Sequence, residues 1–277
     1  MKGVNTPVQQ MSDYKYIVIS DLDGTLCDSR EILSDQTKKY LLKFQKEHPE
    51  VLFTFSTGRP WAEAKEIYEQ LQLKSYISCL NGSYIYNPHT NHLITSFLST
   101  KFLSYLLNIP QTLNNLVRGA LITDQLLIPL EPNIPRTTLQ SLERSKSNLV
   151  GIKLFFRESD CTIVNEIIEQ IKKFSPTPRV NLFFYPGLIN VELQSSQLDK
   201  SSFVQFISNF LGVEYKNILT FGDNHNDIPM MKGGVRSYAL SNSLFLLKQE
   251  ALVISKYSNN EDGVIKELAS FFSDKYN

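Results

Sequence analysis

The sequence has no excess of charge of either sign, and it contains little cysteine. It has 28 basic and 28 acidic residues and a formal net charge of zero, so no overall field attracts a polyanion such as nucleic acid. Its three cysteines, Cys27, Cys79 and Cys161, are odd in number and far apart. That spacing fits neither a metal site nor a redox motif and favours a reducing compartment. We therefore expect no nucleic-acid partner and a cytosolic location.

Long hydrophobic runs are absent as well. No stretch reaches the roughly 18 consecutive apolar residues that suggest a membrane-spanning helix. Residues 1–13 are polar, have no periodicity and lack the apolar centre of a signal peptide, and we expect them to form a loose tail. We predict no membrane partner, which also excludes an ion pump that works through an aspartyl phosphate.

What the sequence does contain is an alternation of strand and helix patterns. Residues 16–19 and 51–55 are short apolar runs rich in β-branched and aromatic side chains, as in strands buried on both faces. Residues 34–48 lie between them with a helical stripe. A strand at residues 76–80 follows, and a helix and a strand at residues 217–221 resume the alternation late in the chain. The pattern predicts an α/β fold with a parallel sheet covered on both sides.

The middle of the chain has a different pattern. Strand-like segments occur at residues 92–98, 120–129, 151–156 and 180–185 without the regular helix between each pair. We expect a separate α+β domain at residues 84–190, inserted into a core made of residues 14–83 and 191–277.

Acidic residues follow two of the predicted core strands. Asp21 and Asp23 come directly after the first, and Asp223 and Asp227 come after the last. Ligands of an open parallel sheet bind beyond the carboxyl ends of its strands. Neighbouring carboxylates repel unless one is protonated or a cation lies between them, so this grouping favours a Mg²⁺ site. The simpler alternative is that both segments are turns, because Asp, Asn and Gly are common turn residues.

Further residues at strand and helix ends are suited to phosphate. Thr57, Gly58 and Arg59 come directly before a predicted helix start, where main-chain N–H groups can bind an anion. Asn81 and Gly82 end another strand, and Lys200 occupies the first turn of a later helix. The simpler alternatives are a β-branched residue that closes a strand for Thr57 and surface cations for Arg59 and Lys200.

With these residues considered together, the sequence resembles the haloacid dehalogenase-like phosphohydrolases, specifically the Cof-type branch with a large inserted cap. DLDGTL resembles the first motif of the family, FSTGR the second, Lys200 the third and GDNHNDIPMM the fourth. Asn81-Gly82, Asn242 and the segment NNEDGV at residues 259–264 resemble further signatures of the branch. Ser201 stands where the branch usually has glycine after the lysine.

The resemblance implies a mechanism and a metal site. Asp21 would be the nucleophile that forms an aspartyl phosphate, and Asp23 would be the general acid and base. Mg²⁺ would be held by Asp21, the main-chain carbonyl of Asp23 and Asp223, with Asp227 nearby. The inserted domain would close over the crevice and select the leaving group.

The resemblance also implies binding residues and an activity. Phosphate would be bound by Thr57, Gly58, Lys200 and Asn226, and the remainder of the substrate by Arg59, Asn81 and Gly82. The implied function is a Mg²⁺-dependent phosphatase that acts on a small phosphorylated metabolite such as a sugar phosphate. One alternative is a sugar phosphomutase, and another is a non-catalytic phosphometabolite sensor, against which the intact pair of Asp21 and Asp23 argues.

Overall fold

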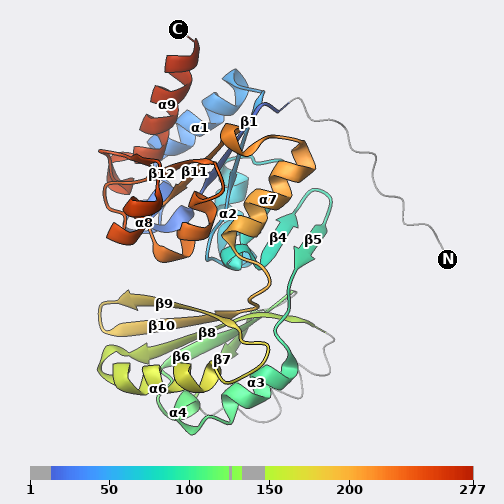
Figure 1. Ribbon diagram of the computed structural model, residues 1–277, viewed down its shortest axis with the longest axis vertical. Helices are drawn as coiled ribbons and strands as arrows, with labels where there is room; N and C mark the ends of the chain where they lie inside the picture. The colour runs from blue at the N-terminus through green and yellow to red at the C-terminus, as the bar shows by residue number, and fades with distance from the viewer. Residues whose placement is uncertain (1–13, 125–126, 133–146, 277) are drawn as a thin grey trace, which may run out of the picture. The chain divides into compact units, whose positions relative to one another are not determined.

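The computed structural model describes residues 14–124, 127–132 and 147–276, and the expected tail at residues 1–13 lies outside these ranges. The chain divides into two compact units (Figure 1). Unit 1 comprises the described parts of residues 1–57, 65–77 and 201–277, and unit 2 comprises residues 58–64 and the described parts of residues 78–200. Within the described ranges, no helix is both long and apolar enough to cross a membrane.

Unit 1 is built on a parallel sheet of five strands, as the α/β pattern predicted. In spatial order the strands are β13 (Val253–Ile254), β12 (Arg236–Ala239), β11 (Ile218–Gly222), β1 (Tyr16–Ser20) and β2 (Val51–Phe55). β1 lies between β11 and β2, and its residues Ile17, Val18 and Ile19 are completely buried. Burial on both faces explains why this strand is a continuous apolar run without a polar alternation.

Helices accompany this sheet. They are α1 (Asp35–Glu47), α2 (Trp61–Gln70), α7 (Lys200–Leu211), α8 (Phe245–Glu250) and α9 (Gly263–Tyr276). α1 begins where the sequence predicts, because the Ser34 hydroxyl accepts a hydrogen bond of 3.0 Å from the N–H of Thr37. α1 and α9 pack through Phe44 and Phe272, whose ring centroids lie 5.1 Å apart in an edge-to-face arrangement.

The third strand expected in the core does not join the parallel sheet. This strand, β3 (Ile77–Cys79), instead belongs to a three-stranded sheet with β4 (Tyr84–Asn87) and β5 (His92–Thr95). Asn81 and Gly82 follow β3 with positive φ angles of 53° and 92°. Leu80, which precedes them, also has a positive φ angle of 50°, so the short segment between β3 and β4 contains three consecutive left-handed residues.

Unit 2 has the α+β architecture expected for the middle of the chain. Its sheet has the spatial order β7 (Leu127–Leu130), β6 (Arg118–Thr123), β8 (Leu149–Arg157), β10 (Leu188–Gln194) and β9 (Arg179–Tyr185), and every paired neighbour is antiparallel. Figure 1 shows α3 (Thr100–Leu107), α4 (Pro110–Asn114) and α6 (Cys161–Ile171) on one face of this sheet.

The expected end of the inserted domain at residue 190 falls inside β10. This strand continues to Gln194 and pairs with β8 and β9 over its whole length, so residues 191–194 belong to the sheet of unit 2. Apolar and polar side chains alternate along β10. Alternation indicates a strand, but it does not indicate which sheet the strand joins.

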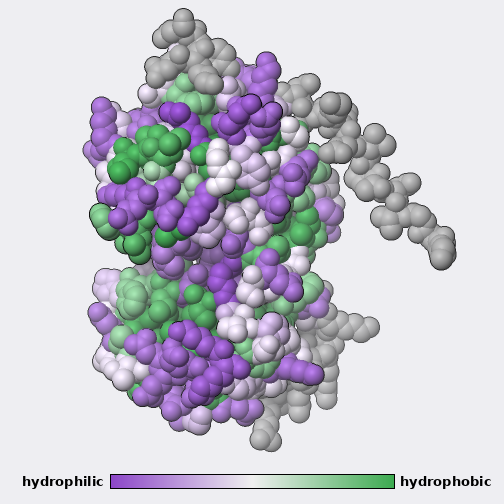
Figure 2. All heavy atoms as spheres, in the orientation of Figure 1, coloured by the Kyte–Doolittle hydropathy of each residue, from purple (hydrophilic) through white to green (hydrophobic). Residues whose placement is uncertain are grey.

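An apolar layer between sheet and helices forms the core of unit 2. Ile152 and Val191 from the sheet, Leu106 from α3 and Ile167 from α6 are all buried in this layer. Figure 2 shows mostly hydrophilic residues over the outer side of α6, as expected for an amphipathic helix that covers a sheet.

We expect the replacement Ile152→Ala to destabilise the protein by about 2–5 kcal/mol, because the surrounding side chains cannot fully close the cavity left in this layer. Leu127→Ala is the matched control, since Leu127 lies in the same sheet and is 44% exposed, and we expect it to change stability by less than about 0.5 kcal/mol. Urea-induced unfolding measures both. Equal losses for the two variants would show that the apolar layer does not carry the stability of unit 2.

Candidate active site

The register of the parallel sheet brings the polar strand ends together in unit 1. Ser20, the last residue of β1, lies beside Phe55 of β2 and Phe221 of β11. The residues that follow these three positions therefore emerge at the same edge of the sheet. They are Asp21, the segment Ser56-Thr57 and the segment Gly222-Asp223.

Three carboxylates gather at this edge. Asp21, Asp223 and Asp227 each offer a carboxylate oxygen, and these oxygens all lie within 4.8 Å of one another. Asp21 is 5% exposed and Asp227 is completely buried. Repulsion between charges in such a site requires a bound proton or a cation. The ligand set consists of hard oxygen donors, which fits Mg²⁺ or a similar hard divalent ion.

Asp227 is held by main-chain donors. One of its oxygens accepts hydrogen bonds of 3.0 Å from the N–H groups of Asp223 and Asn224. The Asn224 side chain in turn accepts a hydrogen bond from the N–H of Asp227, which completes a capping box at the start of the turn His225–Met231, and a further one from the N–H of His225. His225 does not belong to the group of metal-ligand candidates formed by Asp21, Asp223 and Asp227.

The loop after β1 approaches Asp223 very closely. Gly24 has a φ angle of +77°, and a Cβ atom at this position would lie 2.4 Å from a carboxylate oxygen of Asp223. The next residue, Thr25, donates a hydrogen bond of 2.8 Å from its hydroxyl to the other oxygen of Asp223. Glycine at position 24 therefore permits both the turn and the contact.

Asp23 differs from the other acids. Its carboxylate is not part of the group formed by Asp21, Asp223 and Asp227, and the residue is only partly buried. Its backbone has φ −77° and ψ 120°, outside the helical region, between Leu22 and the left-handed Gly24. The two acids of the DLDG motif thus occupy different environments although they are two residues apart.

The C-terminal part of unit 1 supports this loop. Asn242 donates a hydrogen bond of 2.8 Å to the carbonyl of Gly24 and accepts one of 3.0 Å from the N–H of Asn259. The side chain of Asn259 donates to the carbonyl of Cys27 at 3.0 Å. Two asparagines from distant parts of the sequence therefore hold the backbone that carries Asp21.

The NNEDGV segment is itself well anchored. Asp262 accepts hydrogen bonds from the hydroxyls of Ser34 (2.6 Å) and Thr37 (2.8 Å) at the start of α1. Hydrogen bonds from the N–H and the hydroxyl of Ser258 hold the pKa of Glu261 below its ordinary value. The resemblance pointed to this segment, but it gave no indication of which contacts the segment makes.

The other predicted site residues are divided between the two units. Thr57 is completely buried in unit 1, two residues after the end of β2, and Asn226 lies in the turn that carries Asp227. Lys200 is completely buried and is the first residue of α7. It is assigned to unit 2, together with the predicted substrate contacts Gly58, Arg59, Asn81 and Gly82.

Asn81 and Gly82 have structural contacts within unit 2. The Asn81 side-chain nitrogen donates a hydrogen bond of 3.0 Å to Glu192 of β10. A Cβ atom at Gly82 would lie 1.9 Å from the carbonyl oxygen of Asp199. Glu192 could not be predicted as a partner from the sequence, because the contact depends on the chain returning through β10 more than a hundred residues later.

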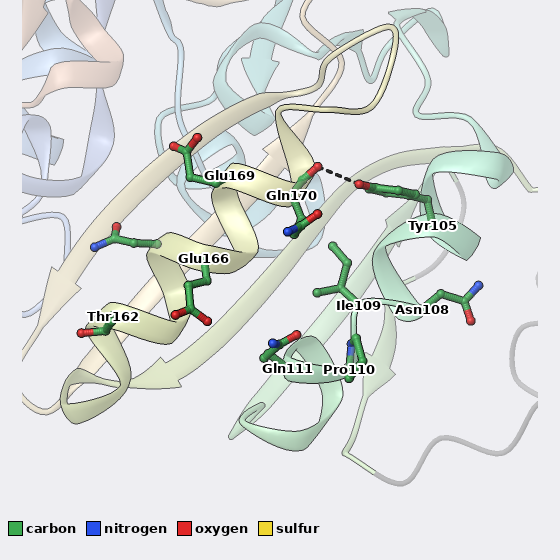
Figure 3. Close-up of a pocket in the computed structure, with 10 residues that line it drawn as sticks. Tyr105, Asn108, Ile109, Pro110, Gln111, Thr162, Glu166, Glu169 and Gln170 are labelled. Atoms are coloured by element: carbon green, nitrogen blue, oxygen red, sulfur yellow. Dashed lines mark hydrogen bonds between the residues drawn. The ribbon is translucent and has the colours of Figure 1, made fainter.

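A cavity of about 650 Å³ lies elsewhere in unit 2, among residues of α3, α4 and α6. Figure 3 shows Tyr105 of α3 and Gln170 of α6 at its margin, joined by a hydrogen bond of 2.8 Å from the tyrosine hydroxyl to the carbonyl of Gln170. None of the predicted site residues lines this cavity. The chemistry of the acidic group, and not the size of a cavity, therefore identifies the candidate active site.

Comparisons with known proteins identify the family of this chain. A family model described as haloacid dehalogenase-like hydrolase matches residues 18–268. The 5-amino-6-(5-phospho-D-ribitylamino)uracil phosphatase YcsE of Bacillus subtilis is 26% identical over 261 residues, which cover 92% of this chain and 95% of that protein. A second enzyme of the same name from that organism, YitU, is 24% identical over 275 residues, covering 95% and 100% of the two chains.

A solved structure shares the fold. The crystal structure of a haloacid dehalogenase-like hydrolase from Bacteroides thetaiotaomicron superimposes with a TM-score of 0.75 at 19% identity, covering 94% of this chain and 100% of that one. The family model spans both the DLDGTL segment after β1 and the acidic segment after β11. The resemblance seen in the sequence is thereby confirmed, and the chain belongs to the haloacid dehalogenase-like hydrolases.

Proposed function

We propose that the protein is a Mg²⁺-dependent phosphatase that hydrolyses a small phosphorylated metabolite through an aspartyl phosphate at Asp21. The observation that carries the proposal is the grouping of Asp21, Asp223 and Asp227 within 4.8 Å, from which Asp23 is excluded. This separation supplies one acid for attack and another for proton transfer. The family and the phosphatase names of the two Bacillus subtilis relatives support the same chemistry.

The residues present suit a magnesium ion. Asp21, Asp223 and the main-chain carbonyl of Asp23 would hold it, with Asp227 nearby, and such a site leaves room for water and substrate oxygens. When bound, Mg²⁺ would offset the repulsion between the carboxylates and keep the Asp21 side chain ionised.

The two acids of the DLDG motif then divide the reaction. A carboxylate oxygen of Asp21 attacks phosphorus, and the bond from phosphorus to the leaving oxygen breaks while the carboxyl group of Asp23 donates a proton to that oxygen. The Asp23 carboxylate next accepts a proton from a water molecule. The oxygen of that water attacks the phosphorus of the intermediate, which releases phosphate and restores Asp21.

We assign the other predicted residues to substrate binding. Phosphoryl oxygens are bound by Thr57, Gly58, Lys200 and Asn226, and the remainder of the substrate by Arg59, Asn81 and Gly82. Unit 2 selects the leaving group, and the cytosolic location expected from the sequence remains part of the proposal. A compact ammonium such as that of Lys200 suits a phosphoryl group because it acts as a point charge.

A phosphate-release screen tests the activity. The panel contains sugar phosphates, nucleotides and 5-amino-6-(5-phospho-D-ribitylamino)uracil, the last because of the names of the Bacillus subtilis relatives. We expect free phosphate from at least one compound with Mg²⁺ and none with EDTA. If a labelled phosphoryl group moved between positions of one sugar without release of phosphate, the protein would be a mutase. No turnover of any compound would contradict the proposal.

We expect Asp21→Asn to lower kcat by at least about a thousandfold, because the amide cannot form the aspartyl phosphate. Steady-state phosphate release measures the loss. The control is Asp35→Asn, the same change at an exposed position in the first turn of α1, which should retain kcat within about twofold. A sensor would show no turnover in the wild-type protein and would retain ligand binding in Asp21→Asn.

Removal of one acid should have opposite effects on stability with and without metal. Without metal, we expect Asp223→Asn to raise the melting temperature, since it removes one charge from the repelling group. With Mg²⁺ at about 100 times its Kd, the wild-type protein should gain about 2.7 kcal/mol of stability, and the variant should gain much less at the same concentration. Thermal unfolding in EDTA and in Mg²⁺ measures both effects. A magnesium-induced gain of equal size in the two proteins would place the metal elsewhere.

A further inference from the structure

Two segments connect the larger part of unit 2, residues 78–200, to unit 1. The outgoing segment, residues 81–83, lies just after the chain enters this part at Ser78, and the returning segment, residues 198–200, ends where the chain leaves it at Lys200. The two are packed backbone against backbone. A Cβ atom at Gly82 would lie 1.9 Å from the carbonyl oxygen of Asp199 and 2.7 Å from the nitrogen of Lys200. No residue other than glycine fits this contact.

One side chain bonds to both segments. Arg179, the first residue of β9, donates hydrogen bonds to the carbonyl of Asn81 (2.9 Å) and the hydroxyl of Ser83 (3.1 Å) in the outgoing segment. Its guanidinium also donates to the carbonyl of Leu198 in the returning segment. The planar fork of an arginine can reach several acceptors in fixed directions, which the single ammonium group of a lysine cannot reproduce.

The outgoing segment has a second attachment to the same sheet. The side chain of Asn81 donates a hydrogen bond of 3.0 Å to Glu192, which is 3% exposed and lies 3.2 Å from Lys153 of β8. Asn81 has a left-handed backbone with φ 53° and ψ 41°, a conformation that asparagine tolerates better than most other non-glycine residues. The main chain of Asn81 is thus bonded to Arg179 of β9, and its side chain is bonded to Glu192 of β10.

The location of Arg179 argues for more than a contribution to stability. Burial lowers the pKa of Arg179 below its ordinary value, and Asp199 and Glu192 oppose this effect, yet an arginine remains charged at neutral pH. A buried cation is costly, and here its acceptors are in the two connecting segments. The bonded carbonyl of Leu198 is two residues before Lys200, the start of α7.

We propose that Arg179 is a positioning residue that joins the outgoing and returning segments and thereby fixes the backbone from which the Lys200 side chain extends. The part that concerns catalysis rests on the proposed role of Lys200 in binding the phosphoryl group. A displacement of about 1 Å at a catalytic group can cost about a hundredfold in rate, so loss of this junction should be visible in kcat although Arg179 itself does not touch the substrate.

Hydrogen exchange tests the junction without any assumption about activity. In Arg179→Met, the backbone amides of residues 82, 83, 199 and 200 should exchange at least about tenfold faster than in the wild-type protein, because the two segments lose their shared anchor. Arg157→Met is the matched control, since Arg157 is an exposed arginine at the end of β8 in the same sheet, and exchange in the segments should not change. Unchanged exchange in a folded Arg179→Met protein would overturn the proposal.

A double-mutant cycle tests the connection with Lys200. We expect Arg179→Met to lower kcat about ten- to a hundredfold in the wild-type background and by less than about threefold in the Lys200→Ala background, because the position of an absent ammonium group cannot matter. Arg179→Lys retains the positive charge but lacks the planar guanidinium, so its kcat should lie between those of the wild-type protein and Arg179→Met. This variant replaces Arg179→Met in the cycle if the methionine variant does not fold. If turnover of Lys200→Ala is too slow to follow, the affinity for inorganic vanadate replaces kcat and is measured in the wild-type protein, the two single variants and the double variant.

Two results would overturn the proposed effect of Arg179 on Lys200. One is an undiminished kcat in a folded variant of Arg179, and the other is an equal loss of kcat in the wild-type and Lys200→Ala backgrounds. Absence of turnover in the wild-type protein would instead contradict the proposed phosphatase function. The hydrogen exchange of the two segments would still decide whether Arg179 joins them, so the two failures are distinguishable.

Discussion

The repulsion between Asp21, Asp223 and Asp227 is the constraint on which the site depends. Two unit charges about 4 Å apart repel by about 4 kcal/mol at an effective dielectric constant of about 20, and oxygens of these three acids all lie within 4.8 Å. The fold places compensating donors around them: two main-chain N–H groups bond to Asp227, and the Thr25 hydroxyl bonds to Asp223. These donors reduce the free-energy cost of holding the three carboxylates together, but they supply no full positive charge. A divalent cation is the partner that matches both the charge and the oxygen ligands.

The same constraint bears on the loop after β1. Acids that share an ion must be held at fixed distances, and Asp21 is followed by a stretch with no regular helical geometry at Asp23 and Gly24. Such a stretch needs external contacts to remain in one conformation. Asn242 and Asn259 supply them through hydrogen bonds to the carbonyls of Gly24 and Cys27. The distant segments that carry Asn242 and Asn259 therefore support the candidate metal site, although they contribute no ligand to the acidic group.

The sequence was sufficient to predict the features that depend on local pattern. The apolar run before Asp21 and the run before Asp223 predict buried parallel strands, and parallel strands end at one edge of a sheet, so the gathering of these acids follows from pattern alone. Features that depend on distant partners were not predictable. Nothing around β3 indicates that it lies outside the parallel sheet, and the alternation in β10 does not reveal that Glu192 bonds to Asn81. The parallel sheet and the acids could thus be predicted, but the limits of unit 2 and the contacts of Asn81 could not.

The buried pair of Lys153 and Glu192 shows why such contacts matter for specificity more than for stability. Burial has the largest single effect on the pKa of Lys153 and lowers it, but the attraction and hydrogen bond of Glu192, together with the charges of Glu63 and Tyr185, leave this pKa raised. A buried ion pair seldom adds much net stability, because desolvation offsets the attraction. Glu192 also accepts hydrogen bonds from the side chains of Asn81 and Asn190, at 3.0 and 3.2 Å, and a shift of β10 by one residue would move Glu192 to the opposite face of the sheet. The pair therefore favours a single register of β10, and through Asn81 that register fixes the place where the chain enters unit 2.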